Sequence, residues 1–292
     1  MINVYKEAGY TSFDVVAKLR GILHQKKIGH TGTLDPAATG VLPVCLGSAT
    51  KLVEELTDKI KEYEAVLLLG TVTDSYDTTG TVLKTEEVAV KEEEVKNVIQ
   101  SFLGEIWQVP PMYSAIKIDG KRLYELAREG KEIERPARKV TIHEIEILET
   151  DLPRIRMRIR CGKGTYIRSL CYDIGEKLGC GGCMESLVRT ASGPFLIGDA
   201  LTLDEIKALK DSGHLTEKIL PVEWFYRDLP SVKIAEEYGK LLDNGNPLPL
   251  SDDLRKVCDG TKVRICRPDG SFKGIYRYES QKNLYVVDKL FS

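Results

Sequence analysis

The chain has 292 residues, of which 42% are hydrophobic and 29% are charged. This composition is typical of a globular protein with a large core, and the length allows one large domain or two. The formal net charge of −2 argues against a protein that is basic over its whole surface. No apolar stretch is long enough to span a membrane, and the N-terminal segment lacks the apolar core of a signal peptide, so we expect a cytoplasmic protein.

Hydrophobic periodicity predicts the first elements of the chain. Apolar residues at helical spacing indicate a helix over Ser12–Leu23, with Ser12 as its N-cap. A buried strand is expected at Tyr63–Leu69, and Thr71–Asp77 continues it towards a turn at Gly80. Further helices are expected at Glu92–Leu103, Thr165–Leu178 and Leu203–Lys210.

Two groups of basic residues lie between the helices expected at Glu92–Leu103 and Thr165–Leu178. Arg135, Arg138 and Lys139 form one, and the other is a run in which arginines alternate with apolar residues from Arg154 to Cys161. A period of two predicts a half-buried strand with its arginines on the polar face. Like charges on one face repel each other unless an anion lies against them. Contact with nucleic-acid phosphates and an ordinary solvated face both remain open for this strand.

The pattern changes near Pro221–Pro230. Short strands are expected beyond it, at Lys262–Arg267, Phe272–Tyr278 and Leu284–Leu290, with a turn at Pro268–Gly270. This pattern predicts a small all-β terminal domain.

The cysteines give little sign of a disulfide or a metal site. Their number, seven, is odd, and a chain of this size does not need disulfides, so a reducing compartment fits. Cys180 and Cys183 form a lone CGGC pair without a second pair or histidines at zinc-ligand spacing. We interpret them as incidental thiols and expect no bound metal.

The most informative segment is Gly29–Leu42, with the sequence GHTGTLDPAATGVL. Pro36 biases Asp35 towards an extended backbone, and the glycines allow tight turns and the close approach of a ligand. A carboxylate on such a loop can act as a nucleophile or a general base. An ordinary glycine-rich turn has the same composition, and the residue chemistry alone leaves both interpretations open.

This segment resembles the active-site motif of the TruB family of tRNA pseudouridine synthases. The resemblance recurs in the expected order along the chain and covers roughly Val4 to Phe195. Its further segments are KEYEAVLLLGTVTDSYDTTG at Lys61–Gly80, QVPPMYSAIKIDGKRLYELAREG at Gln108–Gly130, GTYIRSL at Gly164–Leu170 and LVRTASGPF at Leu187–Phe195.

The resemblance implies an α+β fold. Residues 1–228 would form the pseudouridine synthase catalytic domain on a curved, mostly antiparallel mixed sheet, with an RNA-clamping insertion at about 111–139. Residues 229–292 would form a small β-barrel that binds RNA, of the kind called PUA. The alternative for this last part is a β-rich tail that only packs on the catalytic domain.

It also implies an activity, the isomerisation of uridine to pseudouridine at position 55 in the T-loop of transfer RNA. The enzyme breaks the N-glycosidic bond, turns the base and rejoins it through C5. Because the product is an isomer, no cofactor or metal is needed. The base must be flipped out of its stack to be reached. The T-arm of transfer RNA is the expected partner, with no membrane and no obligatory protein partner, and we expect a monomer.

The family's catalytic residues match Asp35, Tyr63 and Arg168. Asp35 would be the essential nucleophile, which acts at ribose C1′ or through a glycal. Arg168 would be the cation beside it, although the apolar stripe of its helix leaves it on the outer side, as for any surface arginine. Tyr63 lies on the apolar face of its strand, where the family's tyrosine stacks on the target base and offers its hydroxyl for proton removal at C5.

The remaining matches concern the substrate pocket. Tyr166 and Leu187 match residues that line the uracil pocket, and His30 matches a histidine that fills the gap left by the flipped base. The family commonly has Lys-Pro where this chain has Lys6-Glu7, and Leu-Arg-Arg-Thr where it has Leu187-Val188-Arg189-Thr190. These departures leave the local packing open.

Two alternatives to the transfer RNA enzyme remain. A guide-RNA-dependent branch of the family shares the active site but works within a ribonucleoprotein, and it lacks the insertion at Tyr113–Lys139. An RNA chaperone or structural RNA binder would need the fold more than the turnover. The presence of all three catalytic matches argues against an enzyme that has lost its activity.

Overall fold

The computed structural model describes residues 1–118, 120–249 and 258–291. A large sheet forms the body of the molecule, in the strand order β1-β3-β12-β4-β11-β10-β7. In the described residues, β12 and β3 are parallel and the other neighbours in this sheet are antiparallel, so the sheet is mixed and mostly antiparallel as expected. Its strands are β1 (Ile2–Lys6), β2 (Ile28–His30, beside β3), β3 (Thr39–Leu46), β4 (Lys61–Leu69), β7 (Gly104–Gln108), β10 (Arg138–Asp151), β11 (Arg154–Cys161), β12 (Gly182–Ser192) and β13 (Phe195–Leu196, beside β12).

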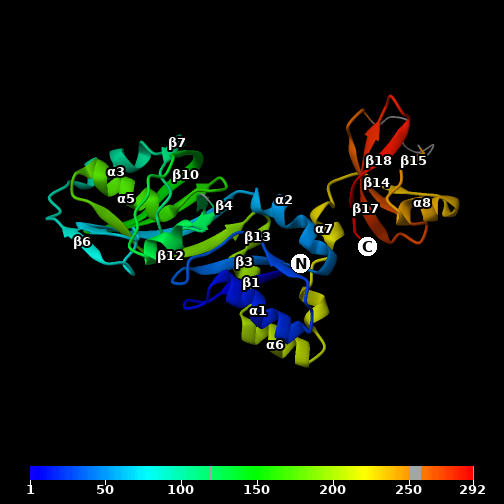
Figure 1. The fold of residues 1–292 in the computed structure, drawn as a ribbon, viewed down its shortest axis with the longest axis horizontal. Helices are drawn as coiled ribbons and strands as arrows, with labels where there is room; N and C mark the ends of the chain where they lie inside the picture. Colours follow the sequence, from blue (N-terminus) through cyan, green and yellow to red (C-terminus); the bar gives the residue numbers. More distant parts are fainter. Residues whose placement is uncertain (119, 250–257, 292) are drawn as a thin grey trace.

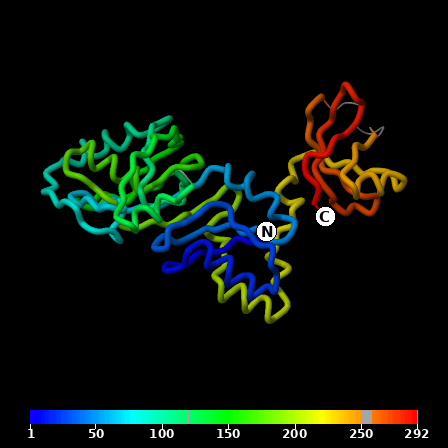
Figure 2. Tube along the Cα trace, viewed as in Figure 1, coloured from blue at the N-terminus to red at the C-terminus, as the bar shows by residue number. Residues whose placement is uncertain are grey.

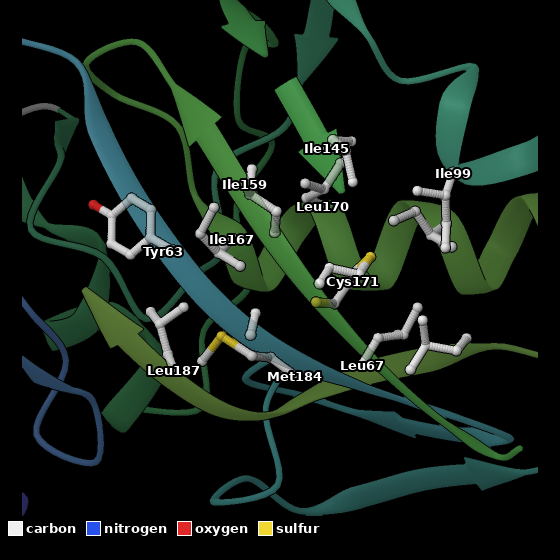
Figure 3. Packing of buried hydrophobic residues seen from close by; sticks show 14 of the residues in the cluster. Tyr63, Leu67, Ile99, Ile145, Ile159, Ile167, Leu170, Cys171, Met184 and Leu187 are labelled. Atoms are coloured by element: carbon white, nitrogen blue, oxygen red, sulfur yellow. The ribbon is translucent and has the colours of Figure 1, made fainter. Parts of the chain in front are cut away.

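Alternation along the central strands decides which face of this sheet carries the main core. On β4 the odd-numbered residues from Lys61 to Leu69 are buried and the even-numbered ones are half-buried. The helices α3 (Glu92–Gln100) and α5 (Ile167–Leu178) pack on the buried face. Figure 3 shows Tyr63, Leu67 and Leu187 on that face, together with Leu170 and Cys171 of α5. The predicted burial of the α5 stripe is confirmed.

A second core lies at the other end of the sheet, where α1 (Ser12–Leu23) and α6 (Leu203–Asp211) pack with β1 and β3 (Figure 1). The predicted span of α1 is confirmed, but its predicted N-cap is wrong. Thr11 has extended dihedrals and its side chain accepts a hydrogen bond from the Asp14 amide. Ser12 instead accepts a hydrogen bond from the amide of Leu34 (2.9 Å), so it tethers the loop that carries Asp35.

Several boundaries differ from the expected ones for local reasons. The helix α3 ends at Gln100, before the turn that leads to Gly104, which has a φ of +90°. The expected strand at Thr71–Asp77 stops early, because β5 (Thr71–Thr73) gives way to a turn in which Tyr76 has a φ of +63°. The strand β6 (Val82–Thr85) then pairs with β5. Shorter elements are α2 (Val53–Thr57), β8 (Lys117–Ile118), β9 (Lys121–Arg122), α4 (Leu123–Arg128), α7 (Val222–Phe225) and α8 (Gly239–Asp243).

A second, smaller sheet begins at Ser231 and lies beyond α7, away from the body of the large sheet (Figures 1 and 2). It has the order β14-β16-β17-β18-β15 and its own core. In the described residues the order is open and the strands curl into half of a barrel, so a complete barrel of the expected kind stays a prediction. The three strands predicted here are found at nearly the predicted positions. The sheet consists of β14 (Ser231–Lys233), β15 (Leu248–Pro249), β16 (Lys262–Cys266), β17 (Phe272–Glu279) and β18 (Leu284–Leu290).

The small sheet contacts the rest of the chain near α2, largely through aromatic residues. Phe272, Ile275 and Phe291 share a core with Leu52 and Leu56, which lie near α2. The division of the chain at residue 228 stays a prediction. Among the helices in the described part of the chain, none combines the length and the apolar character that crossing a membrane requires.

Candidate active site

The loop between β2 and β3 carries Asp35 and is tied down on both sides. The buried Lys6 ammonium donates to the carbonyl of Pro36 (3.1 Å), and the Gly9 amide donates to the same carbonyl (2.9 Å). Gly40 closes the loop with a φ of +105°, and a Cβ there would lie 2.2 Å from the carbonyl oxygen of Arg189. This close approach explains the glycine at position 40. Lys6 therefore supports the loop although Glu7 replaces the expected proline.

Arg168 meets Asp35 from α5 in a two-pronged contact. Its Nε lies 2.8 Å from Asp35 Oδ2, and its Nη2 donates to Asp35 Oδ1 at 3.0 Å. The side chain of Arg168 is only 4% exposed, so it is not the surface arginine that its position off the apolar stripe would also allow. Its remaining donors reach the carbonyls of Ser75 (3.1 Å) and Tyr113 (2.8 Å). Helical periodicity did not show these partners, because they come from segments far away in the sequence.

Asp77 is the second carboxylate beside Arg168, and we did not predict it. Its Oδ2 lies 3.8 Å from Arg168 Nε, and its side chain is buried. Its Oδ1 accepts hydrogen bonds from the Ser75 hydroxyl (2.7 Å) and from the amide and hydroxyl of Thr79. Asp35, Arg168 and Asp77 thus form one buried network. The sequence signal for Asp77 is its place in the segment Lys61–Gly80, where nothing distinguishes it from Asp74.

The surroundings of Asp35 oppose its ionisation on balance. Burial raises the pKa of the Asp35 carboxyl, the Arg168 guanidinium opposes that rise, and the nearby Asp77 carboxylate adds to it. The side chain is nevertheless 34% exposed, so part of it is open to an incoming group. A paired carboxylate with an accessible edge can act as a nucleophile or as a base.

Tyr63 and Leu187 lie next to this network. Both are buried in the cluster that also contains Leu34 and Ala38, the neighbours of Asp35 on its loop, and Ile167, which precedes Arg168. Figure 3 shows Tyr63 and Leu187 side by side on neighbouring strands. Burial raises the pKa of the Tyr63 hydroxyl, which is therefore neutral at pH 7. The structure thus brings both residues to the loop that carries Asp35.

Tyr166 and His30 lie at the margins of the same region. Tyr166 is the N-cap residue of α5, and its backbone amide and carbonyl are both bonded to the side chain of Gln108. Burial raises the pKa of its hydroxyl. His30 ends β2, and burial lowers the pKa of its imidazole. His30 therefore stays neutral at pH 7.

Arg189 of β12 also supports the loop that carries Asp35, and it is a further residue that we did not predict. It is fully buried opposite Tyr63 in the pairing of β12 with β4. Its Nε donates to the carbonyl of Val41 (2.6 Å), and its Nη2 donates to that of Gly32 (3.3 Å). One side chain therefore holds both ends of the loop. The departure at Val188 leaves this arginine in place.

The insertion expected at about residues 111–139 has a small core of its own. Met112, Leu123 and Leu126 are buried in it, with contributions from β8 and α4. Its first residues reach the active site, because the carbonyl of Tyr113 accepts a hydrogen bond from Arg168.

The arginine face of β11 is not a positive surface. All its arginines pair with carboxylates, among them Arg154 with Glu185, Arg158 with Glu64 and Glu146, and Arg160 with Glu144. These side chains project from the face opposite to Tyr63, since the alternate residues Ile155, Met157 and Ile159 of β11 point into the core. The interpretation as a phosphate-binding face is therefore not supported, because glutamates on β4, β10 and β12 already supply the anions.

No metal site is found where the structure can be described. Within residues 1–118, 120–249 and 258–291, no three His, Cys, Asp or Glu side chains are grouped so that they could hold a metal ion. All seven cysteines are free thiols, and Cys180 and Cys183 are buried.

The fold and the Asp35–Arg168–Asp77 network together define a candidate catalytic centre on a curved mixed sheet. The family model "TruB family pseudouridylate synthase (N terminal domain)" matches residues 20–167, and "tRNA pseudouridylate synthase B C-terminal domain" matches residues 168–225. The chain belongs to the TruB family of pseudouridylate synthases, and it is an enzyme of that class.

Curated relatives match this chain over nearly its whole length and nearly the whole of their own. A protein of Lachnoclostridium phytofermentans named tRNA pseudouridine synthase B is 51% identical over 100% of this chain and 99% of its own length. The protein of that name from Clostridium tetani is 52% identical over 92% of each chain. The one from Bacillus pumilus is 42% identical over 100% of this chain and 98% of its own length.

Two solved structures share the fold over the whole of this chain. A chain in a crystal structure of a Cbf5-Nop10-Gar1 complex superposes with a TM-score of 0.72 at 30% identity, over 100% of this chain and 84% of that one. A chain in an H/ACA RNP bound to a substrate RNA containing 2'-deoxyuridine gives a TM-score of 0.70 at 28% identity, with the same coverage.

Proposed function

We propose that this enzyme converts uridine to pseudouridine in transfer RNA, at position 55 of the T-loop. The observation that carries the proposal is the Asp35 carboxylate, held in two contacts by the buried Arg168 and still partly exposed next to Tyr63 and Leu187. The full-length likeness to proteins named tRNA pseudouridine synthase B supports transfer RNA as the substrate. A transfer RNA substrate fits a cytoplasmic enzyme.

The chemistry that we propose needs only the residues of this site. The target base flips out of its stack, because a stacked base cannot present C1′ and C5 to Asp35. Asp35 attacks C1′ or removes a ribose proton to give a glycal, and in both cases uracil leaves through N1. The freed base turns and C5 bonds to C1′, either as the Asp35–C1′ bond breaks or as the ribose regains the proton that it lost. The C5 proton is then lost and N1 takes up a proton. The product is an isomer of the substrate, so the step is balanced without a cofactor.

Arg168 would keep Asp35 ionised for this step. Burial and Asp77 raise the pKa of Asp35, and a bidentate guanidinium is the group that best opposes them. Tyr63 would stack on the target base, with Leu187 and Tyr166 lining the pocket. We propose that His30, which is neutral at pH 7, fills the place that the flipped base leaves.

Affinity for RNA must come from local surfaces, because the chain carries a net charge of −2. We propose that the insertion at residues 111–139 clamps the T-arm and that residues 229–292 act as an RNA-binding domain of the PUA kind. The aromatic packing of Phe272 and Phe291 against the body of the molecule would fix the position of that domain.

A guide-RNA-dependent enzyme is the second candidate, since the structural neighbours from H/ACA particles favour it. Independent action is favoured by the insertion and by the higher identity to the bacterial relatives, 51% against 30% for the Cbf5 chain. A reaction with purified components distinguishes the two.

The substrate assignment can be tested with three RNAs and no other macromolecule. Purified protein is incubated in EDTA with an unmodified transfer RNA transcript, with its isolated T-arm hairpin, and with a hairpin whose target uridine is replaced by cytidine. We expect pseudouridine, mapped by chemical sequencing, in the first two RNAs and none in the third. A requirement for added guide RNA, or modification only at other positions, would contradict the proposal.

Substitutions at Tyr63 separate stacking from proton transfer. Tyr63→Phe keeps the buried ring and loses the hydroxyl, whereas Tyr63→Leu loses both. If the hydroxyl moves the C5 proton, we expect the phenylalanine variant to bind transfer RNA normally but to turn over roughly 10²-fold or more slowly. If only stacking matters, it should be near wild type and the leucine variant poor. A fully active leucine variant would remove Tyr63 from the mechanism.

Salt dependence tests the paired arginines of β11. Each phosphate contact adds roughly −0.7 to −0.9 to the slope of log affinity against log salt. We expect the double variant Arg156→Gln, Arg158→Gln to keep the wild-type slope, because Glu64 and Glu146 already neutralise these side chains. Arg128→Gln on the insertion is the comparison and should flatten the slope. A flatter slope in the double variant would restore the phosphate-contact interpretation.

A further inference from the structure

The turn that carries Asp77 contains an aromatic residue in an unusual backbone conformation. Tyr76 lies between Ser75 and Asp77 and has a φ of +63°. Residues other than glycine, asparagine and aspartate rarely adopt this left-handed region, so surrounding contacts must hold it. The main chain of the turn is fixed on one side by β12, where the Met184 amide donates to the carbonyl of Tyr76 (3.0 Å).

The other side of the turn is held by an aromatic stack. The rings of Tyr76 and Tyr172 lie 4.1 Å apart at an interplanar angle of 17°. Tyr172 is four residues after Arg168 on α5, so the two side chains share one face of the helix. Arg168 bonds to the carbonyl of Ser75 and lies near Asp77, and Tyr172 holds the residue between them. The turn is therefore attached to α5 at two positions about one helical turn apart, through Arg168 and Tyr172.

Both ends of the insertion also contact this turn. At the first end, the Tyr113 hydroxyl reaches Asp74 (3.5 Å) and the Tyr113 carbonyl accepts from Arg168. At the second end lies Arg135, whose side chain is only 10% exposed and whose positive charge opposes the rise that burial causes in the pKa of the Tyr76 hydroxyl. A shift of the insertion against RNA would therefore reach the turn from both sides.

We infer that Tyr76, Tyr172 and Arg135 are positioning residues that hold the Ser75–Asp77 turn against α5, so that Arg168 stays aligned with Asp35 when the insertion grips the RNA. This inference rests on the proposed function and adds to it a physical link between substrate clamping and the catalytic network. None of the three side chains touches the reacting atoms. Their effect is exerted through Arg168, which loses a fixed partner on one side when the turn moves.

The central variants change the stack while leaving the network's own residues intact. Tyr172→Leu removes the ring on α5, Tyr172→Phe keeps it, and Arg135→Met removes the contact from the insertion. Phe102→Leu is the matched control. Its ring also packs on the main core and lies under Lys177 near the other end of α5, so its loss tests general loosening of the helix.

The measurements are single-turnover rate, transfer RNA affinity and thermal unfolding for each variant. We expect Tyr172→Leu to react roughly tenfold to a hundredfold more slowly, because small misplacements of catalytic groups have effects of this size. Its affinity should stay within about twofold of wild type, since the RNA-contacting surface is unchanged. Tyr172→Phe should restore the rate, and Arg135→Met, which leaves the stack and α5 intact, should show a smaller loss of the same kind.

The pH profile separates positioning from a purely structural role. Asp35 is faced by Arg168, Asp77 and Lys6, and of these Arg168 and Lys6 favour its ionised form. If Arg168 loses its alignment, the pKa of Asp35 rises and the acid limb of the rate profile moves to higher pH. A helix that is merely less stable would slow the reaction without moving this limb.

The outcomes distinguish this inference from the proposed function. A Tyr172→Leu variant with the wild-type rate would overturn the inference, as would a loss that Phe102→Leu reproduces with an unmoved pH profile. In both cases the wild type would still modify transfer RNA, so the proposed function would stand. If Tyr172→Leu does not fold, the rate of Arg135→Met decides, and a wild-type rate for that variant would overturn the inference. An inactive wild type would overturn the proposed function and this inference together.

Discussion

Replacing Asp35 with asparagine is expected to abolish pseudouridine formation. The substitution keeps the size of the side chain and one oxygen that can accept from Arg168, but it removes the charge and the nucleophile. We expect the rate to fall by roughly 10⁴-fold or more, in the range seen when nucleophiles are removed from other enzymes. The fold should survive, because the loop is held by Lys6, Ser12 and Arg189 and not by the carboxylate.

The measurement is single-turnover formation of pseudouridine, with transfer RNA affinity as the control. Affinity should stay close to wild type, which would show that the site is intact. Appreciable turnover by a preparation whose mass confirms the substitution would remove Asp35 from the nucleophile's role. Deamidation back to aspartate must be excluded by the same mass measurement.

Replacing Arg168 is expected to affect both activity and stability. Its buried guanidinium contacts Asp35 and the carbonyls of Ser75 and Tyr113. In Arg168→Met the two carboxylates lose the guanidinium between them, and breaking such a buried ion pair typically costs about 3–5 kcal/mol. We expect about 2–3 kcal/mol here, because Asp35 keeps an exposed edge that water can solvate.

The activity of Arg168→Met should fall roughly 10²–10³-fold, and its pH dependence should change in a defined direction. Without the guanidinium the pKa of Asp35 rises further above its ordinary value, so the ionised form appears only at higher pH. The acid limb of the rate profile should therefore move to higher pH. Arg168→Lys should recover little, because an ammonium cannot reproduce the planar fork. Wild-type rates and an unmoved acid limb in Arg168→Met would show that the arginine has only a structural role.

The sequence predicted well those parts of the fold that depend on local periodicity. Alternation gave β4 and β11, and helical spacing gave α1 and the buried stripe of α5, because each pattern reports which side of an element faces apolar neighbours. The same reasoning left Arg168 off the apolar stripe, and only the family resemblance placed it beside Asp35. Periodicity cannot show that a loop, a turn and an insertion from three distant parts of the chain supply carbonyls and carboxylates to a polar side chain.

Asp77, Tyr76 and Arg189 were missed for the same reason, since their partners come from distant parts of the chain. Asp77 and Tyr76 lie in a turn, where no repeating pattern marks the side that meets α5. Arg189 is a charged residue on β12, yet it is buried because it reaches two loop carbonyls. The sequence shows the arginines of β11, but it does not show that glutamates neutralise them. This neutralisation depends on which strands lie next to β11 in the sheet, and those strands carry glutamates opposite the arginines.

The central claim is that Asp35, held by Arg168, isomerises one uridine of transfer RNA without help from a cofactor, a guide RNA or another protein. Its most direct test is the mapping of pseudouridine in an unmodified transcript after incubation with purified wild type or Asp35→Asn, in a metal-free buffer. We expect a single new pseudouridine at position 55 with the wild type and none with the variant. No modification by the wild type, modification at other positions, or equal modification by both proteins would contradict it.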